Sequence, residues 1–169
     1  MMIDPMFCTT IRLMDPFGHQ CIAVLPSARV QRVLIKLLHR IGLFPCYKGY
    51  RCALAALSAM LDDPTLLTAS TTRLYPLLAN RLRCSTSMVE RNLRHAIGIV
   101  FAHGNRAVLE QCFGTYTDGS RPTNTAFLGG LFSVLQLQLL EMASEAAGAQ
   151  SAQLELLEMA GETTGPQSA

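Results

Sequence analysis

Apolar residues recur every three or four positions between residues 30 and 41, and this periodicity constrains the fold more than any other feature of the sequence. In VQRVLIKLLHRI the apolar positions share one face of a helix. They are Val30, Val33, Leu34, Leu37, Leu38 and Ile41. Gly42 follows and predicts the end of the helix, because glycine readily adopts the left-handed conformation that closes many helices. The segment therefore predicts an amphipathic helix.

Proline and aspartate mark the boundaries of further helices. A second helix is predicted from about residue 48 to residue 60, after which Asp63 can cap and Pro64 can begin a short helix. Another short helix is predicted over residues 76–82, since proline fits a first turn. Leu and Ala are abundant, whereas β-branched and aromatic residues are sparse and Trp is absent. This composition favours helices over strands, so we expect an all-α fold.

The cysteines and the first residues bear on the cellular compartment. The six cysteines contain no CxxC pair, and none lies at metal-ligand spacing from a histidine. The opening residues, MMIDPMF, lack the basic and apolar stretches of a secretory signal. No apolar run approaches the roughly 20 residues of a membrane span. We therefore expect reduced thiols and a cytoplasmic protein with no membrane partner.

No motif predicts catalysis. The sequence contains no Gly-rich phosphate loop, no paired-carboxylate motif and no metal-binding cluster. Cys84 and Cys112 each lie near a histidine in sequence, which is a weak signal for a nucleophile. We expect no enzyme, no catalytic residue, no metal site and no cofactor.

Charge divides the chain into three parts. Residues 29–138 carry 13 of the 14 Lys and Arg residues but only 5 of the 12 Asp and Glu residues, a net charge of +8. Residues 139–169 carry five Glu and no Lys or Arg, and residues 1–28 read as an N-terminal extension or remnant linker. A basic body suits a polyanionic partner, because each phosphate that is neutralised releases counterions. Many helical domains are mildly basic, however, so charge alone gives only modest support for nucleic-acid binding.

The acidic segment contains a duplication. LLEMASEAAGAQSA at 139–152 returns as LLEMAGETTGPQSA at 156–169, a period of 17 residues. One unit is too short to bury its own face, so we interpret residues 139–169 as a low-complexity tail of fraying helix and disorder. The alternative is that the LLEM clusters form a helix that binds a partner.

The segment from about residue 75 to residue 93 has the spacing of a helix-turn-helix. Apolar and small residues surround a predicted turn, namely Leu78, Ala79, Leu82, Cys84, Val89 and Leu93. Ala79 is the informative position, because a larger side chain where the two helices cross would push them apart. Arg83 stands where many such turns have glycine, which weakens the pattern.

The second helix of this motif is predicted to run to about Ala102, after a start at which Ser85, Thr86 or Ser87 could cap. Its apolar face contains Val89, Leu93, Ala96, Ile97 and Val100, and its opposite face contains Ser87, Glu90, Arg91, Arg94 and Gly98. Arginine can hydrogen-bond guanine O6 and N7, and glutamate can accept from cytosine N4. The polar stripe is therefore able to read base pairs from a major groove.

Two simpler interpretations of this stripe stay open. Glu90 and Arg94 can form an i,i+4 ion pair on a solvated face, and Ser87 and Glu90 can form a capping box. Periodicity alone does not separate these structural roles from base reading.

The chain resembles the DNA-binding effector domain of the sporulation initiation response regulator, the stage-zero sporulation protein A family of endospore-forming bacteria. The resemblance covers roughly residues 32–138 and rests on several motifs in one order. They are LLHRIG at 37–42, KGY at 48–50, LYP at 74–76, VERNLRHAI at 89–97, HGN at 103–105 and RPTN at 121–124.

This resemblance implies a six-helix bundle of the response-regulator effector type, with a helix-turn-helix and no winged helix. Its fourth long helix is expected to enter the major groove of double-stranded promoter DNA at boxes that read approximately TGTCGAA, with two copies bound as a tandem homodimer. The sigma subunit of RNA polymerase is a further partner that it suggests. The DNA-binding residues expected on this basis are Thr86, Ser87, Glu90, Arg91, Arg94, His95 and Arg121.

Three features depart from the family pattern. Met88 replaces a basic residue that is usual in the recognition helix, which predicts weaker backbone contact or a shifted site preference. Gly129 and Gly130 lie in the last helix, where each costs about 1 kcal/mol relative to Ala and should soften the element. The 28 residues before the first helix are too few for the family's receiver domain, so Asp4 and Asp15 are not expected to be phosphoacceptors.

Two functions from different classes follow. The leading hypothesis is a stand-alone, sequence-specific transcriptional regulator that binds promoter DNA without phosphorylation control. The alternative is a protein-interaction module or antagonist that has kept the fold and sequesters a full-length relative or the transcription machinery. Met88, the absent receiver and the acidic repeated tail motivate the alternative.

Overall fold

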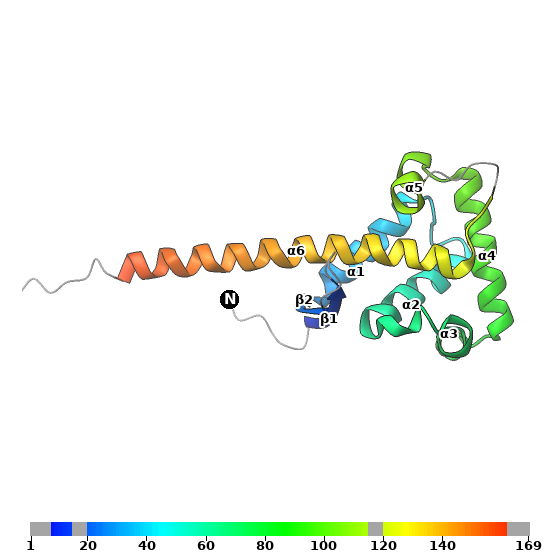
Figure 1. Cartoon of the computed structure of the whole chain (residues 1–169), viewed down its shortest axis with the longest axis horizontal. Helices are drawn as coiled ribbons and strands as arrows, with labels where there is room; N and C mark the ends of the chain where they lie inside the picture. Colours follow the sequence, from blue (N-terminus) through cyan, green and yellow to red (C-terminus); the bar gives the residue numbers. More distant parts are fainter. Residues whose placement is uncertain (1–7, 15–19, 115–119, 162–169) are drawn as a thin grey trace, which may run out of the picture.

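The computed structural model describes residues 8–14, 20–114 and 120–161 of the chain. Six α-helices occupy most of these residues, which confirms the predicted helical fold. They are α1 (Ser27–Arg40), α2 (Lys48–Asp62), α3 (Tyr75–Leu82), α4 (Thr86–His103), α5 (Arg106–Phe113) and α6 (Asn124–Gly161). Figure 1 shows α6 running along the whole body, with α4 standing across its first turns at one end.

Helix α2 lies at the centre of the helical body. It contacts α1, α4 and α6, and side chains from most of its length are buried. The part of α6 that covers it buries Phe127, Leu128, Leu131, Leu135 and Leu139. One continuous core therefore supports α4 from behind, which leaves the outer face of α4 toward solvent.

Several helices in the structure end or begin where the sequence predicted. Helix α1 ends before Gly42, whose φ of 86° is the left-handed conformation expected after a helix. Helix α2 ends at Asp62, and the Asp63 carboxylate caps the 3₁₀ turn η2 (Pro64–Leu66) by accepting from the Thr65 amide. The hydrogen bond from the Thr65 hydroxyl, helped by Arg73, holds the pKa of Asp63 below its ordinary value. A π-helical turn, η3 (Ser70–Leu74), then leads into α3 and was not predicted.

A β-hairpin precedes the helices and differs from the linker predicted for residues 1–28. Strand β1 (Cys8–Met14) pairs antiparallel with β2 (Gln20–Pro26), with Ile11 opposite Ala23. Ile11, Leu13 and Leu25 belong to the same core as the helices, so the hairpin packs onto the body beside α1 and α6 (Figure 1). In β1 the exposed Thr10 and Arg12 alternate with the buried Ile11 and Leu13, the pattern of a half-buried strand, whereas the exposed residues of β2, Ile22 and Val24, are themselves apolar. The alternation in β1 is short, and the composition of the whole chain does not reveal it.

Helix α6 continues into residues 139–169, for which the sequence predicted a low-complexity tail. Leu139 is fully buried, and Leu140 and Met142 pack against the core, so the first turns of that segment belong to the body. The helix then runs on to Gly161, beyond the rest of the molecule (Figure 1). Residues 124–149 form a stretch that is long and apolar enough to cross a membrane by length and composition. The inner side of this stretch is packed in the protein core, as expected for the core helix of a globular domain.

Gly129 and Gly130 lie on the part of α6 that faces other elements. A Cβ atom on Gly130 would lie 2.5 Å from the Phe113 ring of α5. The glycine thus lets Phe113 approach closely enough to stack on Phe127, with ring centroids 5.4 Å apart. Its cost in helix propensity is offset by this aromatic contact.

Candidate nucleic-acid interface

Helices α3 and α4 form the predicted helix-turn-helix. Leu78 and Val89 are fully buried between the helices, and Ala79 is buried where a small side chain was predicted. The turn closes α3 with two hydrogen bonds, from the Cys84 amide to the Ala79 carbonyl at 2.9 Å and from the Arg83 amide to the Asn80 carbonyl at 3.3 Å. This is the Schellman arrangement that ends many helices.

Arg83 occupies the left-handed position of this turn. Its φ and ψ are 52° and 51°. Among the described residues it is the non-glycine residue with a positive φ. An L-residue with a Cβ atom pays a steric cost in this conformation that glycine does not pay. Arg83, which stands where many such turns have glycine, therefore lies at a position whose left-handed backbone conformation favours glycine.

Ser85 begins the second helix. Its hydroxyl accepts a hydrogen bond from the Met88 amide at 3.2 Å, so Ser85 is the N-cap among the three hydroxyl residues that could have capped. Glu90 then lies five residues beyond the cap, and the capping box considered for Ser87 and Glu90 is not the one that forms. The cap leaves Thr86 and Ser87 in the first turn of α4, and both are exposed.

The inner face of α4 is the predicted one. Its buried residues are Val89, Leu93, Ala96, Ile97 and Val100. Gly49 of α2 lies directly behind them, because a Cβ atom there would lie only 2.4 Å from the Asn92 carbonyl oxygen. The absence of a side chain at Gly49 lets α2 and α4 cross at close range, which fixes the depth at which α4 sits on the body.

The outer face of α4 carries most of the predicted site residues. Thr86, Ser87, Arg91, Arg94 and His95 are exposed, and Glu90 is half-buried. The Arg94 guanidinium donates to the Glu90 carboxylate at 2.6 Å, so the solvated ion pair considered from sequence is present. Arg94 is nevertheless 72% exposed, and a guanidinium has five N–H donors, so this pair leaves Arg94 able to bind another group.

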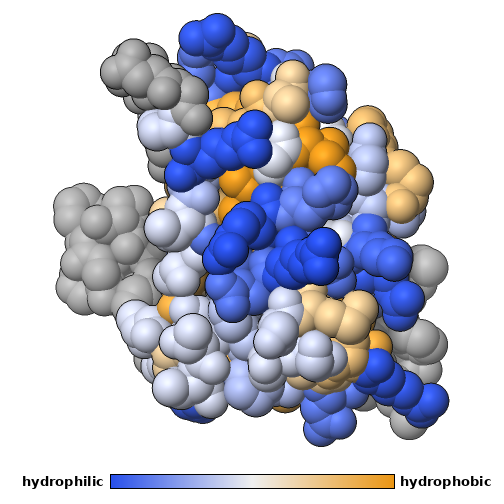
Figure 2. All heavy atoms as spheres, turned by 90° about the vertical axis from the view of Figure 1, so that its right-hand side faces the viewer, coloured by the Kyte–Doolittle hydropathy of each residue, from blue (hydrophilic) through white to orange (hydrophobic). Residues whose placement is uncertain are grey.

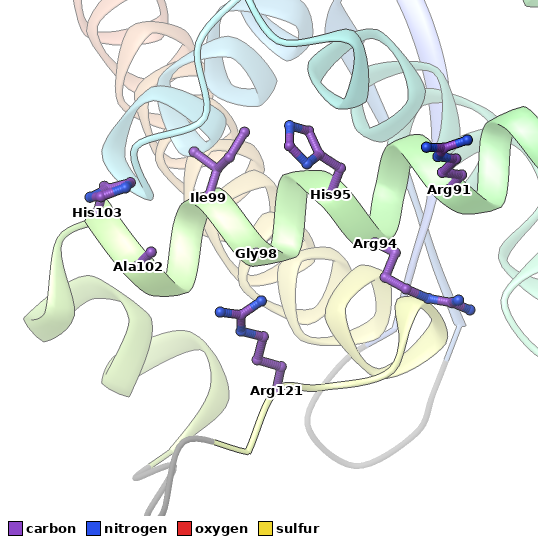
Figure 3. A pocket seen from close by; sticks show the side chains of 8 residues that line it. All are labelled: Arg91, Arg94, His95, Gly98, Ile99, Ala102, His103 and Arg121. Carbon is purple, nitrogen blue, oxygen red and sulfur yellow. The ribbon is translucent and has the colours of Figure 1, made fainter.

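Arg121 joins this face from a different part of the chain. It lies in the segment before α6, and its Nη1 atom would be 3.1 Å from a Cβ atom on Gly98 of α4. Figure 3 shows the Arg121 side chain reaching toward the middle of α4, with Arg94 farther along the same helix. Gly98 thus provides the space in which Arg121 lies against the helix.

A shallow hollow of about 440 Å³ runs along α4 between these groups. It is lined by Arg91, Arg94, His95, Gly98, Ile99, Ala102, His103 and Arg121 (Figure 3). Ile99, Ala102 and His103 were not among the predicted site residues. Their spacing of four, seven and eight residues after His95 was the available signal, because such positions continue one stripe of a helix.

The hollow lies on a strongly hydrophilic side of the molecule. Figure 2 turns toward the viewer the end of the molecule where α4 stands, and hydrophilic residues gather across its centre. Arg91, Arg94 and Arg121 bring three positive charges to the hollow, and Glu90 beside it brings one negative charge. Such a surface attracts polyanions.

Asn124 joins the start of α6 to α4 by a hydrogen bond. Its side-chain amide donates to the Glu90 carbonyl oxygen at 3.1 Å, and both Asn124 and Pro122 are buried. Separate sequence motifs therefore meet at α4: RPTN through Asn124, and KGY through Gly49. Two other motifs also meet, since Gly42 at the end of LLHRIG lies against Gly104 in the middle of HGN.

Metal ligands and reactive thiols are the other kinds of site that the residues described by the structure could form. No three His, Cys, Asp or Glu side chains among these residues are grouped so as to hold a metal ion. Burial raises the pKa of the Cys52 thiol, and burial likewise raises the pKa of Cys112, which disfavours the reactive thiolate at both.

A short helix, a tight turn and a second helix with one buried face and one exposed basic face together define a helix-turn-helix domain of the DNA-binding class. Comparison with known families agrees with this class and narrows it. Residues 34–135 match the family described as sporulation initiation factor Spo0A C terminal. The chain belongs to this family.

Membership in this family establishes the general function of the chain. The chain contains a DNA-binding effector domain of the type found in a sporulation regulator, and its role is in transcription regulation. The family is a regulatory one and is not a known enzyme family. A DNA-binding domain of this kind implies a location in the cytoplasm, at the nucleoid.

Proposed function

We propose that this chain is a sequence-specific regulator that reads promoter DNA by placing the outer face of α4 in the major groove. The exposed stripe of Ser87, Arg91, Arg94 and His95, backed by a fully apolar inner face, is the observation that carries the proposal. Helix α4 has 18 residues and so extends about 27 Å, and a major groove about 12 Å wide accepts a helix of this kind.

The first half of α4 supplies the base-reading groups. Arg91 and Arg94 each present a guanidinium that can bind O6 and N7 of guanine, and Glu90 can accept from N4 of cytosine. The Glu90–Arg94 pair holds the two side chains in a defined arrangement, in which adjacent guanine and cytosine edges would be recognised together. Thr86 and Ser87, at the positive end of the helix, are placed to donate to a phosphate.

Arg121 contacts the DNA differently in this proposal. It comes from outside α4 and lies across the middle of the helix at Gly98, rather than at the end that enters the groove. A cation at this place suits a backbone phosphate, which supports binding without reading sequence. His95 lies between the two groups of contacts and lines the same hollow.

Selection from a random duplex library, followed by fluorescence anisotropy, tests the proposal. The purified chain should enrich one short sequence and bind it at least about a thousandfold more tightly than a scrambled duplex at physiological salt, in the range typical of specific regulators. Equal affinity for enriched and scrambled duplexes would leave a non-specific DNA-binding domain and refute promoter reading.

The family resemblance extends the proposal to assembly. Two copies on tandem boxes, and contact with the sigma subunit of RNA polymerase, are the partners that it implies. Gel-shift titration on duplexes with one or two copies of the enriched sequence measures the first. A two-box duplex that binds each copy independently, with no gain in affinity, would argue against the tandem dimer.

A second candidate function is suggested by α6. Beyond the buried Leu139 this helix carries exposed Glu141 and Glu145, while the body that it leaves is basic. A helix of this kind suits protein interaction, including the sequestration of a relative. Replacement of Glu141 and Glu145 by glutamine tests it: loss of capture of a full-length relative with unchanged DNA binding supports interaction through this part of α6, and unchanged capture removes its basis.

A further inference from the structure

The DNA-facing side of α4 includes one group that hydrogen bonding does not explain. Within α4, all of which the structure describes, Met88 is the large apolar residue that is exposed, with 48% of its surface accessible. Its neighbour Val89 is fully buried in the core. Packing therefore does not account for a methionine at position 88.

The position of Met88 is well defined. The Met88 amide donates a hydrogen bond to the Ser85 hydroxyl, and the next residue, Val89, is buried in the core. The first turn of α4 is therefore held at both residues. Met88 lies three residues before Arg91 and seven before His95, which places it on the same stripe of the helix as these two exposed side chains. It belongs to the end of α4 whose residues contact base edges in helix-turn-helix proteins.

We propose that Met88 reads the C5 methyl group of a thymine in the major groove. This inference rests on the proposed function of α4 and assigns it a specificity-determining residue. Thymine alone among the four bases carries an apolar group on the major-groove edge. A flexible, polarisable methionine can pack against such a group, and the contact removes apolar surface of both partners from water.

The proposed contact complements the charged residues beside it. Arg91, Arg94 and Glu90 distinguish G·C pairs by hydrogen bonds, whereas none of them favours a methyl group. Met88 would add selection for a T·A pair at one position next to these contacts. In a minor-groove complex the methyl group would be out of reach, so the contact is also specific to the docking proposed for α4.

Replacement of thymine by deoxyuridine tests the proposal without disturbing the protein. Each thymine of the sequence enriched by the full chain is replaced in turn, which removes one methyl group and keeps base pairing. We expect one replacement to weaken binding about three- to fivefold, the factor that burial of one such group supplies, and the others to change it less than twofold.

Three variants complete the test. Met88→Ala should bind the thymine and deoxyuridine duplexes equally, and Met88→Leu should keep most of the difference. Leu137→Ala is the matched control, because Leu137 is 52% exposed on α6, away from α4. It should behave as the unmodified chain. Thermal melting should show all three folded, since neither side chain is buried.

The outcomes separate this inference from the proposed function. If the chain enriches no sequence, the proposed function itself fails. If it enriches a sequence but no deoxyuridine replacement weakens binding, the role of Met88 is refuted while promoter reading stands. A methyl effect of unchanged size in Met88→Ala refutes it equally, because another residue then makes the contact.

Discussion

The side-chain amide of Asn124 donates a hydrogen bond to the backbone carbonyl of Glu90, with 3.1 Å between nitrogen and oxygen. This bond joins the first residue of α6 to the helix that carries the proposed base-reading groups. Arg121 lies three residues before Asn124, and the buried Pro122 fixes the intervening backbone. The position of Arg121 beside Gly98 thus depends on a contact made from the start of α6.

Replacement of Asn124 by alanine should lower the free energy of unfolding by about 0.5–1.5 kcal/mol, because the part-buried hydrogen bond to the Glu90 carbonyl is lost while that carbonyl keeps its bond within α4. Urea denaturation measures this loss. Ser133→Ala is the control, since its hydroxyl bonds the Gly129 carbonyl on an exposed part of α6 and should cost less than about 0.5 kcal/mol. Equal losses in the two variants would show that the hydrogen bond of Asn124 stabilises the fold no more than an exposed hydrogen bond does.

Replacement of Gly49 by alanine should destabilise the domain, because the new methyl group would meet the Asn92 carbonyl oxygen and the Ala96 side chain of α4. We expect a loss of about 1–3 kcal/mol, together with weaker DNA binding as α4 is pushed outward. Gly148→Ala offers the opposite case, since a Cβ atom there meets nothing within 4 Å and alanine favours the helix by about 1 kcal/mol. A Gly49→Ala variant as stable as the unmodified chain would contradict the close crossing of α2 and α4.

Replacement of Arg83 by glycine should stabilise the chain by up to about 1 kcal/mol, because it relieves the left-handed conformation of a residue with a Cβ atom. Arg83→Ala removes the same charge but keeps the Cβ atom, so it should give no such gain. Chemical denaturation of the pair separates backbone strain from charge. A gain of equal size in both variants would assign the effect to the charge.

Arg94→Ala and Arg121→Ala should weaken DNA binding in different ways. Loss of Arg94 should cost about 1–3 kcal/mol on the enriched duplex and relax selection at one base pair, while its exposed pair with Glu90 contributes little to stability. Loss of Arg121 should weaken binding to all duplexes alike and reduce the salt slope by about one. Anisotropy on enriched and scrambled duplexes over a range of salt distinguishes them. Unchanged discrimination in Arg94→Ala would show that Arg94 does not read bases.

Local patterns in the sequence predict much of this fold. The three- and four-residue spacing of apolar side chains identifies α1 and the inner face of α4, since both are one-sided helices against one core. Gly42, Asp63 and Pro64 mark helix boundaries through backbone and capping preferences that depend on neighbouring residues only. Ala79 indicates the helix crossing because the contact requires a small side chain.

The remaining features depend on contacts between distant residues or on short patterns within a longer average. The hairpin escaped prediction because seven-residue strands barely change a composition dominated by Leu and Ala. The choice of Ser85 as cap could not be made among three consecutive hydroxyl residues. Neither the approach of Arg121 to Gly98 nor the Asn124–Glu90 bond has a local signature, because each joins segments more than 20 residues apart.

Methylation of bound DNA by dimethyl sulfate tests the central claim most directly, because the reagent attacks guanine N7 in the major groove and adenine N3 in the minor groove. The enriched duplex would be treated with and without the chain, and with Arg94→Ala. We predict that the chain protects guanine N7 atoms within the enriched sequence, that Arg94→Ala loses protection at one guanine, and that adenine N3 atoms there stay reactive. Protection confined to adenine N3, with every guanine N7 still accessible, would contradict the placement of α4 in the major groove.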